Sequence, residues 1–253
     1  MYDTKENSWR QGKRLPTPLH HSAVVSYAGK VYVVGGYHDF SNPSDSVLIY
    51  DPGEDSWSKG AEMPTPRGAL TVQVLEGIIY AVGGEGGGGV LDINEAYDPE
   101  TDTWERKASM PTPREHLASA VVFGKLYVIG GRQGFPGTSN LNINEEYDPD
   151  SDTWITKPPM PSNRGGVAGA AVNGRIYIFG GEALTMVFDS SEEYDVKKET
   201  WTVREPMRVA RHGLGSAAVG NRVYIIGGGE AQHLFTLISS SRANEILTIR
   251  EEN

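Results

Sequence analysis

The sequence contains no cysteine. This absence excludes disulfide bonds, thiolate catalysis and zinc or iron–sulfur sites that are held by cysteine. Long apolar runs are missing too, because no segment approaches the roughly 18 apolar residues that a membrane-spanning helix needs. Residues 1–20 lack the apolar centre of a signal peptide, which slightly favours a cytoplasmic location and leaves the compartment otherwise undetermined.

Basic residues are fewer than acidic ones, 23 against 33, which gives a formal net charge of −10. No dense basic cluster offsets this balance. The sequence therefore predicts neither nucleic acid nor an anionic membrane as a partner. Convincing helical periodicity is also absent, and the chain instead shows the two-residue alternation of β-strands.

What the sequence does contain is a repeat. Five segments of alternating apolar residues end in a glycine pair, as in GRIYIFGG at 174–181. Each of five tryptophans follows a Tyr-Asp pair by the same interval, and glycine pairs and tryptophans keep the same spacing of 47 to 50 residues. The glycine pairs begin at 35, 83, 130, 180 and 227, and the tryptophans lie at 9, 57, 104, 154 and 201. Several landmarks in one register indicate a structural repeat of about 50 residues.

Each repeat predicts four short strands, which we name a to d in chain order. Strand a is built of small apolar residues, as in 165–172, and strand b is the alternating segment that ends in the glycine pair. Strand c ends in Tyr-Asp, and strand d carries the tryptophan. Turn sequences separate the strands. Four strands in about 50 residues are typical of one blade of a β-propeller.

Together with the MPTPR segments at 63–67 and 110–114, these features resemble Kelch repeats over nearly the whole chain. The resemblance implies an all-β, Kelch-type β-propeller with strand a innermost. Small residues suit the crowded axis of such a fold. The glycine pair suits a place where backbone passes close to backbone or adopts a positive φ. We interpret the tryptophans as packing between blades rather than stacking on a ligand.

The repeat predicts a single domain, 1–253, of five four-stranded blades. The expected blades span about 16–62, 63–109, 110–159, 160–206 and 207–253. The last repeat ends in a strand c, at 244–253, whereas the N-terminal segment 1–12 carries a spare strand d. We therefore expect this N-terminal strand to complete the last blade and to close the ring, which would remove open sheet edges.

An arginine that enters strand a and a glutamate on strand c occur together in four repeats. The expected pairs are Arg67 with Glu95, Arg114 with Glu145, Arg164 with Glu192, and Arg211 with Glu245. The first repeat has Leu19 and Leu48 at the two places, so it lacks both charges. We predict a structural Arg–Glu ion pair inside each of blades 2 to 5, replaced by an apolar pair in blade 1.

The b–c connections differ in length and composition, whereas the a–b and c–d turns are short and uniform. Because strands alternate in direction, the b–c and d–a connections share one face, and variable loops on a rigid scaffold usually carry binding. All six histidines fall on this face, His20 among them. The candidate binding residues are His21, Tyr37, His38, Phe40, Glu115, His116, Arg132, Phe135, Glu182, Phe188, His212, His233 and Phe235. We expect Arg132 to meet carboxylates of a ligand and the phenylalanines to act as apolar anchors.

These observations favour a monomeric, non-enzymatic module that binds a protein or a peptide. No catalytic residues, cofactor or metal are expected, because the histidines lack the HxH or HExxH spacing of metal sites. The alternative is a carbohydrate-binding propeller or a sugar epimerase, since bacterial sialic acid epimerases resemble this architecture. In that case His116, Glu115, Arg132 and Glu182 would supply the acid, the base and the cation at the channel mouth. The copper chemistry of the galactose-oxidase type needs a cysteine and is excluded.

Overall fold

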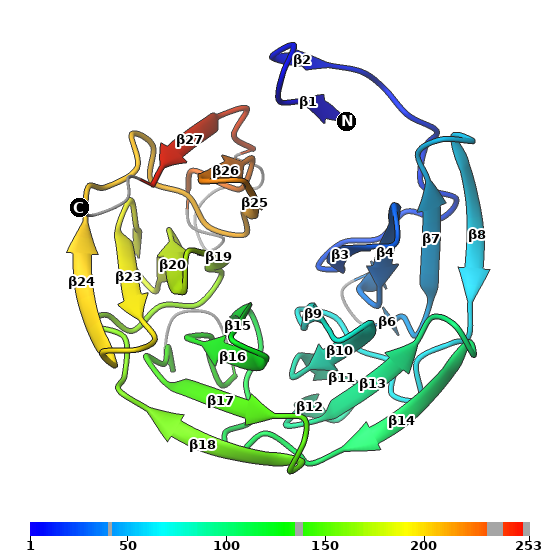
Figure 1. The fold of residues 1–253 in the computed structure, drawn as a ribbon, viewed down its shortest axis with the longest axis horizontal. Coiled ribbons are helices and arrows are strands. Elements are labelled where there is room, and N and C mark those ends of the chain that lie inside the picture. Colours follow the sequence, from blue (N-terminus) through cyan, green and yellow to red (C-terminus); the bar gives the residue numbers. More distant parts are fainter. Residues whose placement is uncertain (40–41, 135–138, 232–239, 250–253) are drawn as a thin grey trace.

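Each repeat forms one small antiparallel sheet, because its apolar segments are joined by turns that reverse the chain. The computed structural model describes residues 1–39, 42–134, 139–231 and 240–249. In four sheets the strands a, b, c and d lie side by side in this order, and the sheets surround an axis with strand a innermost (Figure 1). The predicted all-β propeller of five blades is thus confirmed. Four blades are complete. Blade 1 consists of β3 (Ala23–Tyr27), β4 (Lys30–Val34), β7 (Val47–Asp51) and β8 (Ser56–Gly60), and blade 2 of β9 (Thr71–Leu75), β10 (Ile78–Val82), β13 (Asn94–Asp98) and β14 (Thr103–Lys107). Blade 3 consists of β15 (Ala118–Val122), β16 (Lys125–Ile129), β17 (Asn144–Asp148) and β18 (Thr153–Lys157), and blade 4 of β19 (Ala168–Val172), β20 (Arg175–Phe179), β23 (Ser191–Asp195) and β24 (Thr200–Arg204).

Blade 5 has three strands rather than four. It consists of β25 (Gly215–Val219), β26 (Arg222–Ile226) and β27 (Asn244–Thr248), with β26 in the middle. Among the described residues, no strand pairs with the outer edge of β27. The N-terminal segment instead forms a hairpin of its own, in which β1 (Tyr2–Asp3) pairs with β2 (Ser8–Trp9). The prediction that the N-terminal strand completes the last blade is therefore wrong.

A local turn explains why the N-terminal segment pairs with itself. Residues 2–9 contain both the Tyr-Asp pair and the tryptophan of a c–d unit. Asn7 in the turn between them has a φ of 49°, and Asp55 and Asp102 hold the same place in blades 1 and 2 with φ of 48° and 54°. Pairing across such a short turn costs less chain entropy than pairing with a strand at the other end of the chain.

This N-terminal hairpin contacts blade 1 in the same way as strands c and d of a complete blade contact the blade that follows. Trp57 of blade 1 donates its indole N–H to the carbonyl oxygen of Lys13, in the linker after the hairpin, at 3.1 Å. The linker after blade 1 makes the same contact, since Trp104 donates to Ala61 at 2.9 Å. The hairpin thus occupies the place of strands c and d of a further blade.

On its other side the N-terminal hairpin meets blade 5. The rings of Tyr2 and Tyr224, which lies on β26, are 5.9 Å apart. The corresponding rings of Tyr32 in blade 1 and Tyr97 in blade 2 are 6.4 Å apart. Figure 1 shows the hairpin between blades 5 and 1, with no described strand on its inner side. The ring is therefore bridged at the rim and open toward the axis between β25 and β3.

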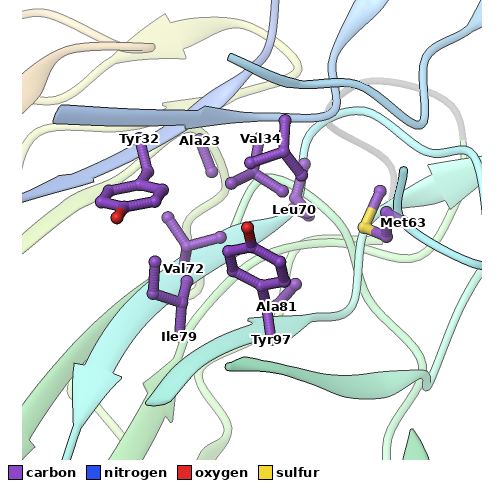
Figure 2. Packing of buried hydrophobic residues seen from close by; sticks show 10 residues of the cluster. Ala23, Tyr32, Val34, Met63, Leu70, Val72, Ile79, Ala81 and Tyr97 are labelled. Carbon is purple, nitrogen blue, oxygen red and sulfur yellow. The ribbon is translucent and has the colours of Figure 1, made fainter. Parts of the chain in front are cut away.

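The apolar core lies between adjacent blades, because alternate residues of each strand face the neighbouring blade. Figure 2 shows the core between blades 1 and 2. Tyr32 and Val34 meet Val72 and Ile79, and Met63 joins them from the linker; all five are at most 5% exposed. Burying side chains of this size stabilises the fold by about 1.5–3 kcal/mol each. Each blade therefore depends on its neighbours for most of its core.

The glycine pair stands where two blades approach backbone to backbone. In blade 2, Gly84 donates its N–H to the carbonyl oxygen of Arg114 in blade 3 at 3.0 Å. A Cβ atom on Gly83 would lie 2.6 Å from the same oxygen, and Gly83 has a φ of +64°. Both the close approach and the left-handed backbone exclude a side chain. The repeated pair is therefore the contact that sets one blade against the next.

Among the described residues, three small hairpins extend the b–c connections on one face. They are β5 (Tyr37–Asp39) with β6 (Asn42–Pro43), β11 (Glu85–Gly86) with β12 (Gly89–Val90), and β21 (Glu182–Ala183) with β22 (Met186–Val187). Each begins directly after a glycine pair, so the pair also fixes where the hairpin leaves the blade. None of the described residues forms a helix long and apolar enough to cross a membrane.

Candidate functional site

A ring of backbone hydrogen bonds surrounds the axis at the face that carries these hairpins. Its members are the second residues after the arginine position of each repeat, and all five have φ between 52° and 66°. Ala69 donates its N–H to the carbonyl oxygen of His21, and His116 donates to Ala69, each at 2.9 Å. Gly166 donates to His116 at 2.9 Å, and Gly213 donates to Gly166 at 2.8 Å. These four hydrogen bonds, which we call the axial ring, link the five blades in an open series from His21 to Gly213, and all five residues line the channel mouth.

A second set of residues lies around the axial ring. In each repeat, the residue that follows the arginine position forms a β-bridge with the residue that follows the glycine pair. The bridged pairs are His20 with Tyr37, Gly68 with Glu85, Glu115 with Arg132, Gly165 with Glu182, and His212 with Gly229. Most of the polar side chains that we predicted for this face occupy these bridged positions.

The channel mouth is a cavity of about 530 Å³. Three histidines predicted as binding residues, His21, His116 and His212, line it, and His20 joins them. Their blades are far apart in the sequence, so it is the ring that brings them together. Between the histidines the wall consists of small or apolar residues such as Leu70. The mouth therefore offers imidazole groups on an otherwise mainly apolar wall.

One half of the mouth is aromatic. The rings of His21 and His116 lie 4.9 Å apart, and the ring of Tyr37 stacks on that of His20 at 5.4 Å. The Nδ1 atoms of His20 and His21 lie 2.6 Å apart, so one donates and the other accepts. Tyr37 crosses to blade 2, where its hydroxyl donates to the carbonyl oxygen of Glu85 at 2.9 Å. A Cβ atom on Gly68 would collide with the Tyr37 ring, so the glycine makes this crossing possible.

A buried charged cluster, which we call the charged half of the mouth, lies behind His116 and His212, and Arg132 is at its centre. Arg132 Nε is 2.5 Å from a carboxylate oxygen of Glu115, and Arg132 Nη1 is 2.7 Å from one of Glu182. Arg132 Nη2 lies 3.3 Å from both ring nitrogens of His116, which also contacts Glu115. Arg132, Glu115 and Glu182 are each at most 4% exposed. Arg132 therefore holds side chains of the protein together in this structure, and its expected contact with carboxylates of a ligand stays a prediction.

The ionic contacts shift the pKa values of this half. Burial alone would lower the pKa of Arg132, but the charges and hydrogen bonds of Glu115 and Glu182 outweigh it and raise the pKa. Burial would raise the pKa of Glu115, but His116 and Arg132 lower it below its usual value. The pKa of Glu85 is raised, first by burial and then by the charge of Glu115. Glu115 and Glu182 contact Arg132, and Glu85 interacts with it electrostatically, so this cluster contains three carboxylates and one guanidinium.

The four Arg–Glu pairs lie inside the blades, away from the mouth. Each arginine side chain is 0% exposed and forms an ion pair with the glutamate on strand c of its own blade. The distances are 2.6 Å for Arg67–Glu95, 2.6 Å for Arg114–Glu145, 2.9 Å for Arg164–Glu192 and 2.7 Å for Arg211–Glu245. In blade 1, Leu48 is 2% exposed and Leu19 is half-buried.

The remaining predicted residues lie in the b–c connections. His38 is exposed on β5, whereas Phe188 is half-buried, with its ring 5.6 Å from the guanidinium carbon of Arg164. Phe188 therefore covers a buried ion pair instead of standing free as an anchor. Leu184 and Met186, which were not among the predicted binding residues, are 41% and 49% exposed at the β21–β22 hairpin. Phe40, Phe135, His233 and Phe235 lie outside the described residues.

A metal site was not expected in this region. Among residues 1–39, 42–134, 139–231 and 240–249, no three or more His, Asp or Glu side chains are grouped so as to hold a metal ion. The histidines of the mouth instead contact one another, Tyr37 and the carboxylates of Glu115 and Glu182.

Comparison with known proteins places this geometry in a family. The chain matches the family model described as the KLHDC2/KLHL20/DRC7 Kelch-repeats domain over residues 1–157 and 105–228. Protein binding is the general role of propellers of this type. The chain is also similar to the solved structure titled "Structure of YjhT", with 19% sequence identity and a TM-score of 0.73 over 84% of this chain and 73% of that one. At this identity the similarity shows the fold alone. No curated protein matches the chain.

Proposed function

Because this chain belongs to the Kelch-repeat family, we propose that it is a non-enzymatic binding protein that takes up a peptide loop of a partner protein at the channel mouth. The loop would approach from the face formed by the b–c and d–a connections. Three b–c hairpins rise around the mouth there, and the axial ring holds its inner side chains in place. A rigid centre with variable loops around it suits the recognition of a protruding segment.

The chemistry of the mouth favours a partner loop with a basic residue at its tip, and the excess of carboxylates is the observation that carries the proposal. Glu115 and Glu182 share one arginine, and the exposed Glu85 lies beside them with a raised pKa. An arriving guanidinium or ammonium group would pair with Glu85 and relieve the repulsion from Glu115. The aromatic half, with Tyr37, offers ring faces that also attract a cation.

Apolar contacts at the rim would add to this central interaction. Leu184 and Met186 project from the β21–β22 hairpin, and both are more than 40% exposed. Methionine adapts its shape to different apolar partners, which suits a recognition surface. The partner loop would then place its basic residue in the mouth and an apolar residue against this hairpin.

A sugar-binding or epimerase function remains the second candidate, because the cavity volume of about 530 Å³ falls within the range of roughly 300–1,000 Å³ for small-molecule sites. Such a function would need an arginine that can receive the sugar carboxylate. Three nitrogen atoms of Arg132 already contact Glu115, Glu182 and His116. This arrangement favours the peptide-binding function over the sugar function.

A selection experiment separates the two candidates. A library of random cyclic heptapeptides would be selected on the immobilised protein, and the enriched peptides titrated by calorimetry. We expect arginine or lysine at one dominant position. We also expect Glu85→Lys to weaken binding at least tenfold, which corresponds to about 1.4 kcal/mol.

The matched control is Glu100→Lys, which makes the same charge change in the exposed c–d turn of the same blade, on the opposite face. This variant should bind the peptides unchanged. Enriched peptides without a basic residue, or equal binding by the two variants, would contradict the proposal. Saturable binding of N-acetylneuraminic acid that is lost in His116→Ala would support the sugar function instead.

A further inference from the structure

The opening between blade 5 and blade 1 exposes surfaces that are buried elsewhere in the ring. On the innermost strands beside it, Val24 of β3 is 58% exposed and Val219 of β25 is 50% exposed. Val122 of β15 and Val172 of β19, which are equivalent to Val219, are 5% exposed, and Val72 of β9, which is equivalent to Val24, is 4% exposed. Figure 1 shows β3 and β25 on opposite sides of this opening, with the N-terminal hairpin spanning only the rim.

Gly227 carries the clearest mark of an absent neighbour. In blade 4, a Cβ atom on the equivalent Gly180 would collide with the carbonyl oxygen of Arg211 in the next blade. Gly227 keeps almost the same backbone, with a φ of +67° against +61°, but a Cβ atom there would meet nothing within 4 Å. The residue thus has the conformation that faces a neighbouring carbonyl, but no described residue supplies one.

The N-terminal hairpin shows the same pattern from the other side. Trp201 of blade 4 donates its indole N–H to Pro158, in the linker that follows blade 3, at 2.8 Å. Trp9 holds the equivalent place on the hairpin and is 59% exposed. The segment that would cover Trp9 is the linker after a fourth strand of blade 5. Tyr2 and Tyr224 already hold the two sides of the opening at the spacing seen between complete blades.

We propose that this opening is a docking site for a segment of a partner polypeptide that carries a strand d followed by an a–b hairpin of the repeat pattern. Strand d of the segment pairs with the outer edge of β27, and its strand b pairs with β1. The residue before the tyrosine of that strand b then lies opposite Tyr2, as Ile176 lies opposite Tyr194 in blade 4. The segment thereby completes blade 5 and the inner half of the further blade by strand addition.

The contacts that the docked segment would form repeat those made at the four closed junctions. The carbonyl oxygen of its arginine position receives the N–H of Gly228, as that of Arg211 receives the N–H of Gly181 at 2.8 Å. Its small-residue strand covers Val219 and Val24. A segment without the repeat pattern cannot reproduce these contacts. An unpaired sheet edge such as that of β27 is also a ready template for another strand.

The test uses a synthetic peptide that copies residues 200–228, which hold strand d of blade 4 and strands a and b of blade 5. Its tryptophan is replaced by phenylalanine, so that tryptophan fluorescence reports on the protein alone. We expect 1:1 binding in calorimetry and a blue shift of the emission, because the peptide covers the indole of Trp9. The shift should disappear in Trp9→Phe, and a scrambled peptide should not bind.

Gly227→Ala provides the decisive variant and Gly220→Ala its matched control. Both glycines have positive φ, +67° and +59°, and a Cβ atom on either meets nothing within 4 Å. The strain is therefore similar, but only Gly227 faces the opening. We expect Gly227→Ala to weaken peptide binding at least tenfold and Gly220→Ala to leave it unchanged. Equal binding by the two variants would contradict the proposal.

The same segment joined to the C-terminus of the chain gives a second measurement if the free peptide aggregates. The joined protein should unfold several degrees higher than the original chain, and this gain should be lost when Gly227→Ala is introduced. No gain, or a gain independent of Gly227, would overturn the proposal. A dimer of the original chain in sedimentation that masks Trp9 would also overturn it, because a second copy would then occupy the opening.

Discussion

Blades 4 and 5 carry the same sequence pattern in different surroundings. Both have the arginine, the small-residue strand and the glycine pair. Blade 4 has four strands and lies between two other blades, whereas blade 5 has three strands and borders the opening. The small residues of its β19 alternate between buried and half-buried, whereas four of the five residues of β25 are exposed. The pattern thus fixes how a blade folds, and the neighbouring blades decide which of its residues become core.

The buried ion pairs show the same difference. Arg164 and Arg211 are both fully buried, and each donates further hydrogen bonds to backbone carbonyl groups of its own blade. The glutamates differ, since the Glu192 side chain is 4% exposed and that of Glu245 is 18% exposed. Strand d covers the pair in blade 4, and blade 5 lacks this strand. Water therefore screens the pair of blade 5 more than that of blade 4.

The largest expected effect comes from removing the glutamates. Glu192→Leu leaves Arg164 as a buried charge without its partner, so the free energy of unfolding should fall by about 3–5 kcal/mol. Glu245→Leu should cost less, about 1–3 kcal/mol, because water can reach the remaining charge. Urea unfolding of the two variants measures the difference directly.

A double-mutant cycle controls for the loss of packing. Arg164→Leu combined with Glu192→Leu should be at least about 1 kcal/mol more stable than the sum of the single effects predicts. Purely additive costs would show that the pair does not act as a unit. Equal losses of stability in Glu192→Leu and Glu245→Leu would contradict the inference that water screens the ion pair of blade 5 more than that of blade 4.

A smaller effect is expected from the glycine pairs. Gly180→Ala forces a methyl group against the carbonyl oxygen of Arg211 in a left-handed backbone, so we expect a loss of about 3 kcal/mol from strain and overpacking together. Gly227→Ala bears only the backbone strain, about 1–2 kcal/mol. Thermal unfolding compares the two, with Gly220→Ala as a reference for strain alone. A cost for Gly227→Ala as large as that for Gly180→Ala would mean that the open junction is occupied in solution.

The smallest effect concerns the tryptophans. Trp201→Phe removes the hydrogen bond to Pro158 and should cost about 1 kcal/mol. Trp9→Phe changes an exposed side chain and should stay within about 0.5 kcal/mol. Chemical denaturation of the two variants, followed by circular dichroism, measures the loss of unfolding free energy in each. Equal losses would mean that Trp9 is covered in solution.

The blade itself was predictable because its signals are local and repeated. The alternation of strand b and the interval between Tyr97 and Trp104 recur in one register, and each has a short-range cause in strand pairing. The paired loss of charge in the first repeat pointed to the Arg–Glu contacts, because neither partner is tolerated alone in a dry interior. These signals lie within one repeat and do not depend on how the blades meet.

Ring closure was not predictable from the same signals. The segment that contains Tyr2 and Trp9 is equally compatible with a complete c–d hairpin and with a single strand that pairs with a distant sheet. The short turn at Asn7 favours the local pairing, but the sequence alone does not compare its free energy with that of the distant alternative.

The residues of the charged half were predicted to lie together, but their ion pairs with one another were not, for a different reason. Glu115 and Glu182 lie in different repeats, and only the bridge between the residue after the arginine and the residue after the glycine pair places them around Arg132. Gly165 lies beneath Arg132, with the position of its absent Cβ only 3.3 Å from Arg132 Cδ. A side chain at Gly165 would push Arg132 away from Glu182.

The hydrogen bonds around the axis have a consequence for how such a scaffold can diversify. They use main-chain atoms alone, so the side chains at those five places are not needed to hold the blades together. Two are imidazoles, one is a methyl group and two are hydrogen atoms, so blades 1 and 3 place rings at the mouth and blades 4 and 5 place no side chain there. Residues that tolerate a left-handed backbone can be exchanged there. Such exchanges would alter the width and polarity of the channel mouth while the fold stays the same.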